Sequence, residues 1–413
     1  MNPTTANHPP MRHDAALIGL VGLAHGCSHF SQLLLAPLFP WLKDAFGVSY
    51  AELGLLMSIF FVVSCIVQTL SGFVVDRFSP RPVLFVGLGL LGLSAFGFAA
   101  STSYAMLALF SVLAGMGNGV FHPVDFTLLN RKVHPSRLGH AFSIHGITGS
   151  LGWALAPMVL VPLTLAYSWR VALACAGSLV LAVLLVLWFN RHRLTLEALP
   201  VAHASRHSDG LPTEGRLDFL KIPAVWMCFG FFFFYAAALS AVQAFAPEAA
   251  RQLHGVPEHV AALCLTIYMV CSAGGMVAGG FLASDPARCE RIVAIGFGVG
   301  ASIALLIGFA SLPALAVPVL FGAMGFGVGI VGPSRDLLVK RSAPDNATGR
   351  VYGVVYSGLD IGQALAPLVF GTLMDLQRPS MVWLGIALLQ AVLIVSAFNV
   401  RRVRRTRLAA ATA

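Results

Sequence analysis

Residues 115–126 read GMGNGVFHPVDF, and residues 325–336 read GFGVGIVGPSRD. The two stretches lie 210 residues apart and share three glycines and one proline in a single register. The match continues without a gap, because the sequence ALAP at residues 154–157 returns at residues 364–367. Self-similarity at a fixed offset indicates that the chain is built from two related units.

Both stretches lie within long apolar runs. The chain has 413 residues, of which 57% are hydrophobic and 10% are charged, whereas soluble proteins carry about 25% charged residues. Runs of about 20 apolar residues, long enough to cross a hydrocarbon core about 30 Å thick, recur along the chain. We predict an all-α membrane protein with twelve transmembrane helices at residues 17–40, 51–75, 82–101, 104–130, 138–165, 168–190, 222–249, 258–283, 291–311, 313–341, 348–374 and 380–400.

A polar segment at residues 191–221 divides these spans into six and six. Because six is an even number, both halves begin on the same side of the membrane. A pseudo-two-fold axis along the membrane normal should relate them, with the working site between them. We therefore expect five regions: an N-terminal tail, two six-helix bundles joined by a linker, and a basic tail, at 1–16, 17–190, 191–221, 222–400 and 401–413.

The distribution of Lys and Arg predicts the orientation. Twenty-one of the 26 basic residues fall in segments on one side of the predicted spans, and four fall on the other. Positive residues mark cytoplasmic loops, so we expect a multi-pass inner-membrane protein with both termini in the cytoplasm. The same bias accounts for the net charge of +9 without a nucleic-acid partner. The basic tail could contact anionic lipid, although it is better explained as a topology signal.

The loop after the second span reads GFVVDRFSPR at residues 72–81. With twelve spans in two parallel halves, this loop resembles the signature of the major facilitator superfamily, which Gly72, Asp76, Arg77 and Arg81 match. The resemblance implies a two-bundle transporter in which Asp76 braces the start of the helix near residue 348. An anion favours a helix N-terminus, so we expect Asp76, Arg77 and Arg81 to act in gating.

A narrower resemblance lies in the middle of the first half. The sequence VFHP at residues 120–123, followed by a GxxGxxxxP pattern at residues 149–157, is similar to the fosmidomycin-resistance-type branch of this superfamily. That branch places an acidic residue directly after HP, whereas here Val124 precedes Asp125. The branch resemblance covers mainly spans 1, 4 and 5.

Charged residues within spans are costly and mark functional sites. Asp125 and Arg335 occupy equivalent positions of the repeat and so lie at equal depth on opposite halves. We expect them to approach when the cytoplasmic side closes, with Asp125 carrying a proton and Arg335 acting in gating. Alternatively, they are a solvated pair at the helix end, or Arg335 pairs with Asp336.

Asp360 lies deeper, between Gly358 and Gly362 in the eleventh span. We predict that it is a second proton-coupling carboxylate. The alternative is a static hydrogen bond within the bundle.

Span 1 contains HGCSHFSQ at residues 25–32. His25 and His29 are four residues apart and share a helix face. We predict a polar cavity wall in the first half that contacts substrate or protons, formed by His25, His29, Gln32, Asn118, His122, His145 and Trp153. Structural hydrogen bonding is one alternative, and a transition-metal site on His25 and His29 is another.

The second half offers Tyr235, Gln243, Tyr356 and Gln363, side chains that can bind an organic molecule. We therefore predict a monomeric secondary transporter that moves a small polar or amphipathic solute by alternating access and proton coupling, with efflux favoured over uptake. A transition-metal exporter is the alternative. An enzyme is not expected, because no nucleophile–base pair stands at a motif spacing, and we expect no cofactor.

Overall fold

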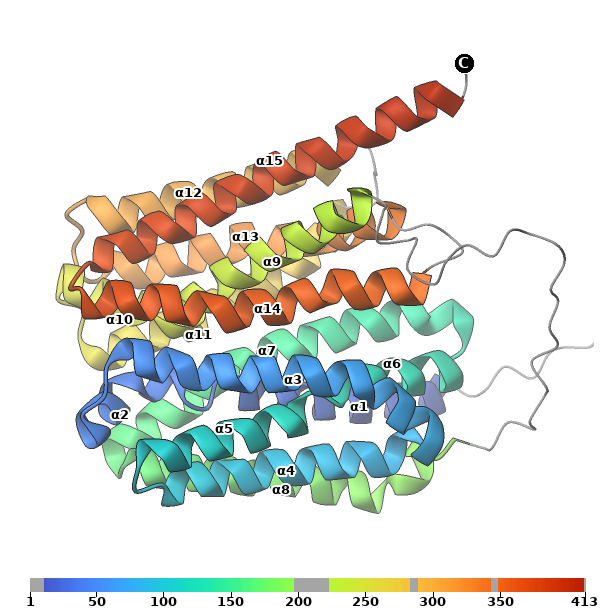
Figure 1. Ribbon diagram of the computed structural model, residues 1–413, viewed down its shortest axis with the longest axis horizontal. Coiled ribbons are helices and arrows are strands. Elements are labelled where there is room, and N and C mark those ends of the chain that lie inside the picture. The colour runs from blue at the N-terminus through green and yellow to red at the C-terminus, as the bar shows by residue number, and fades with distance from the viewer. Residues whose placement is uncertain (1–10, 197–222, 283–288, 343–347, 412–413) are drawn as a thin grey trace, which may run out of the picture.

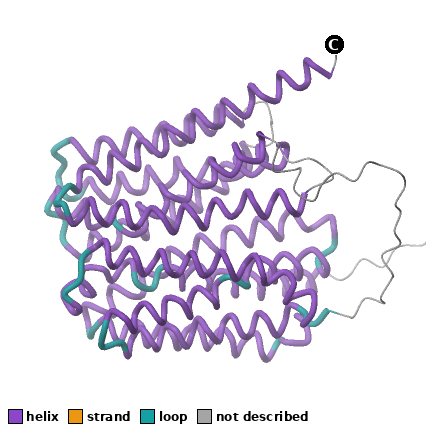
Figure 2. Tube along the Cα trace, in the orientation of Figure 1, coloured by secondary structure: helices purple, strands orange, loops and turns teal. Residues whose placement is uncertain are grey.

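The computed structural model describes residues 11–196, 223–282, 289–342 and 348–411. Its long helices lie side by side in one bundle, with short connections at both ends (Figure 1). The described residues contain helices and loops and no strand (Figure 2). The predicted all-helical fold class is confirmed.

The first half has eight α-helices where six spans were predicted, because two of the spans are broken. The helices are α1 (Met11–Gln32), α2 (Phe39–Phe46), α3 (Tyr50–Phe78), α4 (Pro80–Ala100), α5 (Tyr104–Asn118), α6 (Phe121–Lys132), α7 (Leu138–Ala166) and α8 (Trp169–Phe189). Short 3₁₀ helices precede α2, precede α7 and follow α8, at Ala36–Leu38, Pro135–Arg137 and Arg191–Leu194.

The second half repeats most of this order. Its helices are α9 (Pro223–Ala244), α10 (Ala246–His254), α11 (Glu258–Leu282), α12 (Cys289–Phe309), α13 (Ala316–Ser342), α14 (Thr348–Asp375) and α15 (Pro379–Ala411). The first span of each half breaks at the same repeated Ala-Pro pair, Ala36-Pro37 and Ala246-Pro247. Proline lacks the backbone N–H that a helix interior needs, so the break follows from the sequence.

Eleven stretches among the described residues are long and apolar enough to cross a membrane. They correspond to all the predicted spans except 348–374, which the structure nevertheless forms as the helix α14. The predicted linker falls largely on residues 197–222, which lie outside the described residues.

Span 4 breaks inside the repeated motif. Helix α5 ends at Asn118, and α6 begins at Phe121. Pro123 cannot donate a hydrogen bond to the carbonyl oxygen of Gly119, four residues before it. The Ser71 hydroxyl of α3 donates to that oxygen instead, at 3.2 Å. The equivalent helix of the second half, α13, runs unbroken through Pro333.

The repeated glycines allow close helix packing in both halves. An added Cβ at Gly115 or Gly119 would lie 2.5 Å from a backbone oxygen of α3. Their repeat mates Gly325 and Gly329 press in the same way on the backbone of α11, at Tyr268 and Ser272. Small residues let helices approach where lipid offers no hydrophobic driving force, so these glycines serve the fold.

The two halves meet along α3 with α14 and along α7 with α11. We call the end of the bundle that carries α2 and α10 the loop side, and the opposite end, where residues 191–196 lie, the linker side (Figure 1). On the loop side the Asp375 carboxylate accepts hydrogen bonds from the backbone N–H groups of Tyr50 and Ala51, each at 2.8 Å. An anion at a helix N-terminus is favourable, so this contact fastens the halves together on the loop side.

Candidate functional site

A cavity of about 190 Å³ lies between the two halves. Nine of the residues predicted for the site line it: His25, His29, Gln32, His122, Trp153, Tyr235, Arg335, Asp360 and Gln363. They come from α1, α6 and α7 of the first half and from α9, α13 and α14 of the second. These predicted site residues therefore converge on a cavity between the two halves, which is where the repeat led us to expect the site.

Asp125 is fully buried beside this cavity. Its Oδ2 atom lies 3.1 Å from Nδ1 of His25 and 3.1 Å from Nε2 of His145. The two imidazole rings stack, with centroids 3.5 Å apart and planes 24° apart. A buried carboxylate is costly unless hydrogen-bonded, and donors from α1 and α7 here stabilise a carboxylate on α6.

Two further histidines extend this cluster into the cavity. The His29 ring lies 4.3 Å from the His25 ring and 4.2 Å from the Trp153 ring, centroid to centroid. The His122 ring lies 5.4 Å from the His25 ring. Gly149 provides the room, because a Cβ there would lie 2.8 Å from Nδ1 of His29 and 3.0 Å from Nε2 of His25.

Asn118 is buried and joins several helices of the first half. Its Oδ1 atom accepts hydrogen bonds from the Ser28 hydroxyl at 2.7 Å and from Nε2 of Gln32 at 3.2 Å. Its own Nδ2 donates to the Ser64 hydroxyl at 2.8 Å. The network reaches α7, because Nε1 of Trp153 donates to Oε1 of Gln32 at 2.9 Å. This wall of the cavity is thus held by hydrogen bonds among α1, α3, α5 and α7.

The second half lines the cavity with a cation, a carboxylate and an amide. The Arg335 guanidinium lies 4.6 Å from the Tyr235 ring centroid and 5.3 Å from the Phe232 centroid, distances typical of cation–π contacts. Asp360 accepts a hydrogen bond from Nε2 of Gln68 at 3.1 Å, across the boundary between the halves. The Oε1 atom of Gln363 is buried and has no hydrogen-bond partner.

The structure places Asp125 and Arg335 in different surroundings. The Asp125 carboxylate contacts His25 and His145, whereas the Arg335 guanidinium lies over aromatic rings of α9. Their approach in another conformation stays a prediction. Of the predicted gating residues, Arg81 donates to the Thr195 hydroxyl at 2.8 Å, and Arg77 lies 5.4 Å from the Phe78 ring centroid. The side chain of Asp76 lies outside the described residues, as does that of Tyr356.

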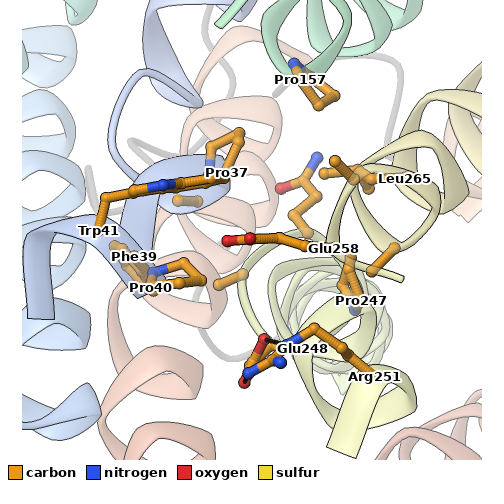
Figure 3. A pocket seen from close by; sticks show the side chains of 15 residues that line it. Pro37, Phe39, Pro40, Trp41, Pro157, Pro247, Glu248, Arg251, Glu258 and Leu265 are labelled. Carbon is orange, nitrogen blue, oxygen red and sulfur yellow. Dashed lines mark hydrogen bonds and ion pairs between the residues drawn. The ribbon is translucent and has the colours of Figure 1, made fainter. Parts of the chain in front are cut away.

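Gln243 lies in a second, smaller pocket of about 50 Å³ on the loop side. Figure 3 shows the Glu258 carboxylate of the second half pointing toward Trp41 of the first, with Glu248 beside Arg251. Arg251 makes two hydrogen bonds to Glu248, at 2.6 and 2.8 Å. Those bonds raise the pKa of Arg251 above its usual range and keep it charged. The pocket lies at the junction where the halves close, away from the histidine cluster.

Sequence reasoning missed Gln68 and Ser64 of α3. Gln68 lines the cavity and contacts Asp360, while Ser64 anchors Asn118. The signal was present, because Gln68 is a strongly polar residue within an apolar span. Ser64 carries no such signal, since serine often bonds its own helix backbone.

Two helical halves around a polar cavity define a class of membrane transport protein. The family model of the Major Facilitator Superfamily matches residues 21–367, and it matches again over residues 229–412. The chain therefore belongs to the Major Facilitator Superfamily. It is a multi-pass membrane transporter and not an enzyme, as the sequence predicted.

Named relatives and solved structures agree with this assignment. The fosmidomycin resistance protein of Escherichia coli K12 is 25% identical over 308 residues, 73% of each chain. The hexuronate transporter of Bacillus subtilis 168 is 22% identical over 370 residues, 86% of each chain. A crystal structure of a bacterial homolog of the human lysosomal transporter Spinster superposes with a TM-score of 0.77 at 13% identity, covering 95% of this chain and 98% of the other. At that identity the structural likeness shows the fold alone.

Proposed function

We propose that the protein is a proton-coupled secondary transporter of the inner membrane that exports a small organic anion through the central cavity. The observation that carries this proposal is the placement of Arg335 in the cavity wall, opposite the histidines of the first half. A guanidinium presents a planar set of N–H donors that suits carboxylate and phosphonate groups. The amides of Gln32 and Gln363 add neutral polar contacts for the rest of the solute.

Coupling to protons is assigned to Asp125 and Asp360. Histidine exchanges protons near neutral pH, and His25 links the buried Asp125 carboxylate to the cavity. Asp360 lines the cavity directly and bonds across the halves to Gln68. A change in the charge of either carboxylate would alter the contacts that favour one conformation over another.

The way the halves meet supports alternating access. With both termini in the cytoplasm, the Asp375 contacts close the outer end of the bundle. Opening that end breaks two hydrogen bonds to the N-terminus of α3. Asp76, Arg77 and Arg81 are proposed to act in the same way at the cytoplasmic end.

The relatives support an organic solute and export. One is named for resistance to fosmidomycin, which favours efflux, and another is named for hexuronate, an organic acid. These names give no support to metal export, so an organic anion is the proposed cargo.

Proteoliposomes test the proposal. Vesicles containing the purified protein are given a pH gradient with the membrane potential clamped, and a panel of labelled organic acids is offered outside. An antiporter accumulates its solute when the lumen is acidic, whereas a symporter does so when the outside is acidic. Accumulation of an acid, with its neutral amide analogue excluded, is the expected result. Equal uptake with and without a gradient would refute coupling, and preference for neutral analogues would refute an anionic solute.

A further inference from the structure

Three histidines of the first half converge from three helices. Nitrogen atoms of His25, His122 and His145 lie within 4.8 Å of one another. We propose that these histidines, together with Asp125, bind one divalent transition-metal ion such as Zn²⁺, which inhibits the transporter and is not its cargo. The sequence indicated a pair, His25 and His29, but the grouped nitrogen atoms belong to residues of α1, α6 and α7.

The donor set suits zinc. Three imidazoles and a carboxylate are common ligands of four-coordinate Zn²⁺, and imidazole also suits Cu²⁺ and Ni²⁺. Metal–nitrogen bonds of about 2.0–2.1 Å in a tetrahedral site put neighbouring donor atoms about 3.3 Å apart. Oδ2 of Asp125 already lies 3.1 Å from a ring nitrogen of both His25 and His145. A metal ion would replace the ring protons that those nitrogens share with the carboxylate.

Nδ1 of the neighbouring His29 is buried without a hydrogen-bond partner, and so are two polar atoms of the four proposed ligand residues. These two atoms are Nδ1 of His122 and the second carboxylate oxygen of Asp125, both buried. Unsatisfied buried polar atoms are unusual in folded proteins, and a cation bound by Nδ1 of His122 would satisfy that nitrogen. His122 and His25 also line the cavity, so an ion in the cavity reaches the cluster. His122 needs the largest adjustment, a shift of its ring toward the His25–His145 pair.

The predicted inhibition has a physical cause. A metal ion fixes α1, α6 and α7 to one another through their side chains and occupies the carboxylate assigned to proton coupling. The inhibition of transport rests on the proposed function, whereas the binding of the metal does not.

Binding is tested on the full-length, tag-free protein by titrating ZnCl₂ in a calorimeter, after treatment with a chelator. The expected result is one saturable site per chain. Cu²⁺ added at the same stoichiometry should give an electron paramagnetic resonance spectrum with hyperfine coupling to several nitrogens. Failure of the wild-type protein to bind Zn²⁺ in a one-to-one ratio would overturn the proposal without any variant.

Variants locate the site. His122→Gln and His145→Gln should each weaken Zn²⁺ binding at least tenfold, since each removes one ligand. His140→Gln is the matched control, because His140 is exposed on the same helix as His145. His29→Gln distinguishes the proposed ligand set from the pair His25 and His29. Zn²⁺ binding should persist in this variant if the proposed set holds the ion, and it should fall if His25 and His29 are the ligands. Unchanged binding in both His122→Gln and His145→Gln would refute the assignment.

Inhibition is measured in the proteoliposomes described above, with Zn²⁺ added at the concentration that saturates the calorimetric site. Transport by the wild-type protein should stop and should recover on addition of a chelator. Transport that continues with the site saturated would refute the inhibitory role. If wild-type vesicles transport none of the acids, the proposed function fails, while the calorimetric result still decides the metal site.

Discussion

The two walls of the cavity occupy equivalent positions of an internal repeat but differ in how their polar groups are held. In the first half, Asp125 and Asn118 each bond to side chains of at least two other helices. In the second half, the amide oxygen of Gln363 is buried without a partner, and Arg335 rests on aromatic rings. The first wall is held by side-chain hydrogen bonds between helices, whereas the second wall presents a guanidinium and an amide to the cavity.

Repeat mates make the contrast direct. His25 corresponds to Tyr235 and Trp153 to Gln363, and all four line the cavity. Asp125 corresponds to Arg335, with opposite charge. Equivalent positions of the repeated fold therefore carry side chains of different chemistry. We assign proton handling mainly to the first wall and solute recognition to the second.

Asp125→Asn should have the largest effect. The amide cannot release a proton, so accumulation driven by a pH gradient should fall at least tenfold, as expected for an essential ionisable group inside a membrane. Exchange of labelled for unlabelled solute, which needs no net proton movement, should persist. The measurement compares the two modes in the same vesicles. Loss of both modes together would mean that Asp125 supports the fold or binding instead of coupling.

Arg335→Gln should have the second-largest effect on transport. Removing a charge-assisted contact of about 1.5–3 kcal/mol weakens solute binding about 10- to 100-fold, and the loss should appear in KM more than in the maximal rate. Arg335→Lys keeps the charge but not the planar fork, so partial recovery is expected. An unchanged KM in Arg335→Gln would show that Arg335 does not bind the anionic solute.

The sequence was sufficient for the fold because its signals are local and repeated. Apolar runs, the 210-residue repeat and the superfamily-like loop required no long-range information, and the Ala-Pro pairs coincide with the breaks in both first spans. The site was predicted less completely. Nine of its lining residues were named, but the pairing of Asp125 with His25 and His145 was not predicted, because the contact of His25 with Asp125 joins residues 100 positions apart.

The placement of Gln243 shows the same limit. Gln243 is a polar residue near the end of the first span of its half. A polar residue within an apolar span is the same signal that predicted the cavity residues. Gln243 instead lies one residue before the end of α9 and lines the loop-side pocket. Its position near the end of the helix was readable from the sequence, whereas the separate pocket at that end depends on how Trp41 and Glu258 pack beside it.

Asn118→Ala should lower stability by about 1–3 kcal/mol, because it leaves the buried polar groups of Ser28 and Ser64 without a partner. Thermal unfolding in detergent measures this as a fall in the midpoint temperature. Asn118→Asp is the conservative comparison, since its oxygens still accept from Ser28 and Gln32 but its side chain no longer donates an N–H to Ser64. An unchanged midpoint in Asn118→Ala would show that the hydrogen bonds of the first wall are not what holds it.

Gln363→Leu should have the smallest effect on stability and is the matched test on the second wall. The Oε1 atom of Gln363 is buried without a partner, so replacing the amide by an apolar side chain of similar size leaves stability unchanged or raises it by about 1 kcal/mol. Solute affinity should fall nonetheless, because the amide is then absent from the cavity. A midpoint that drops as far as that of Asn118→Ala would mean that the two walls are held in the same way and would remove the basis for assigning them different tasks.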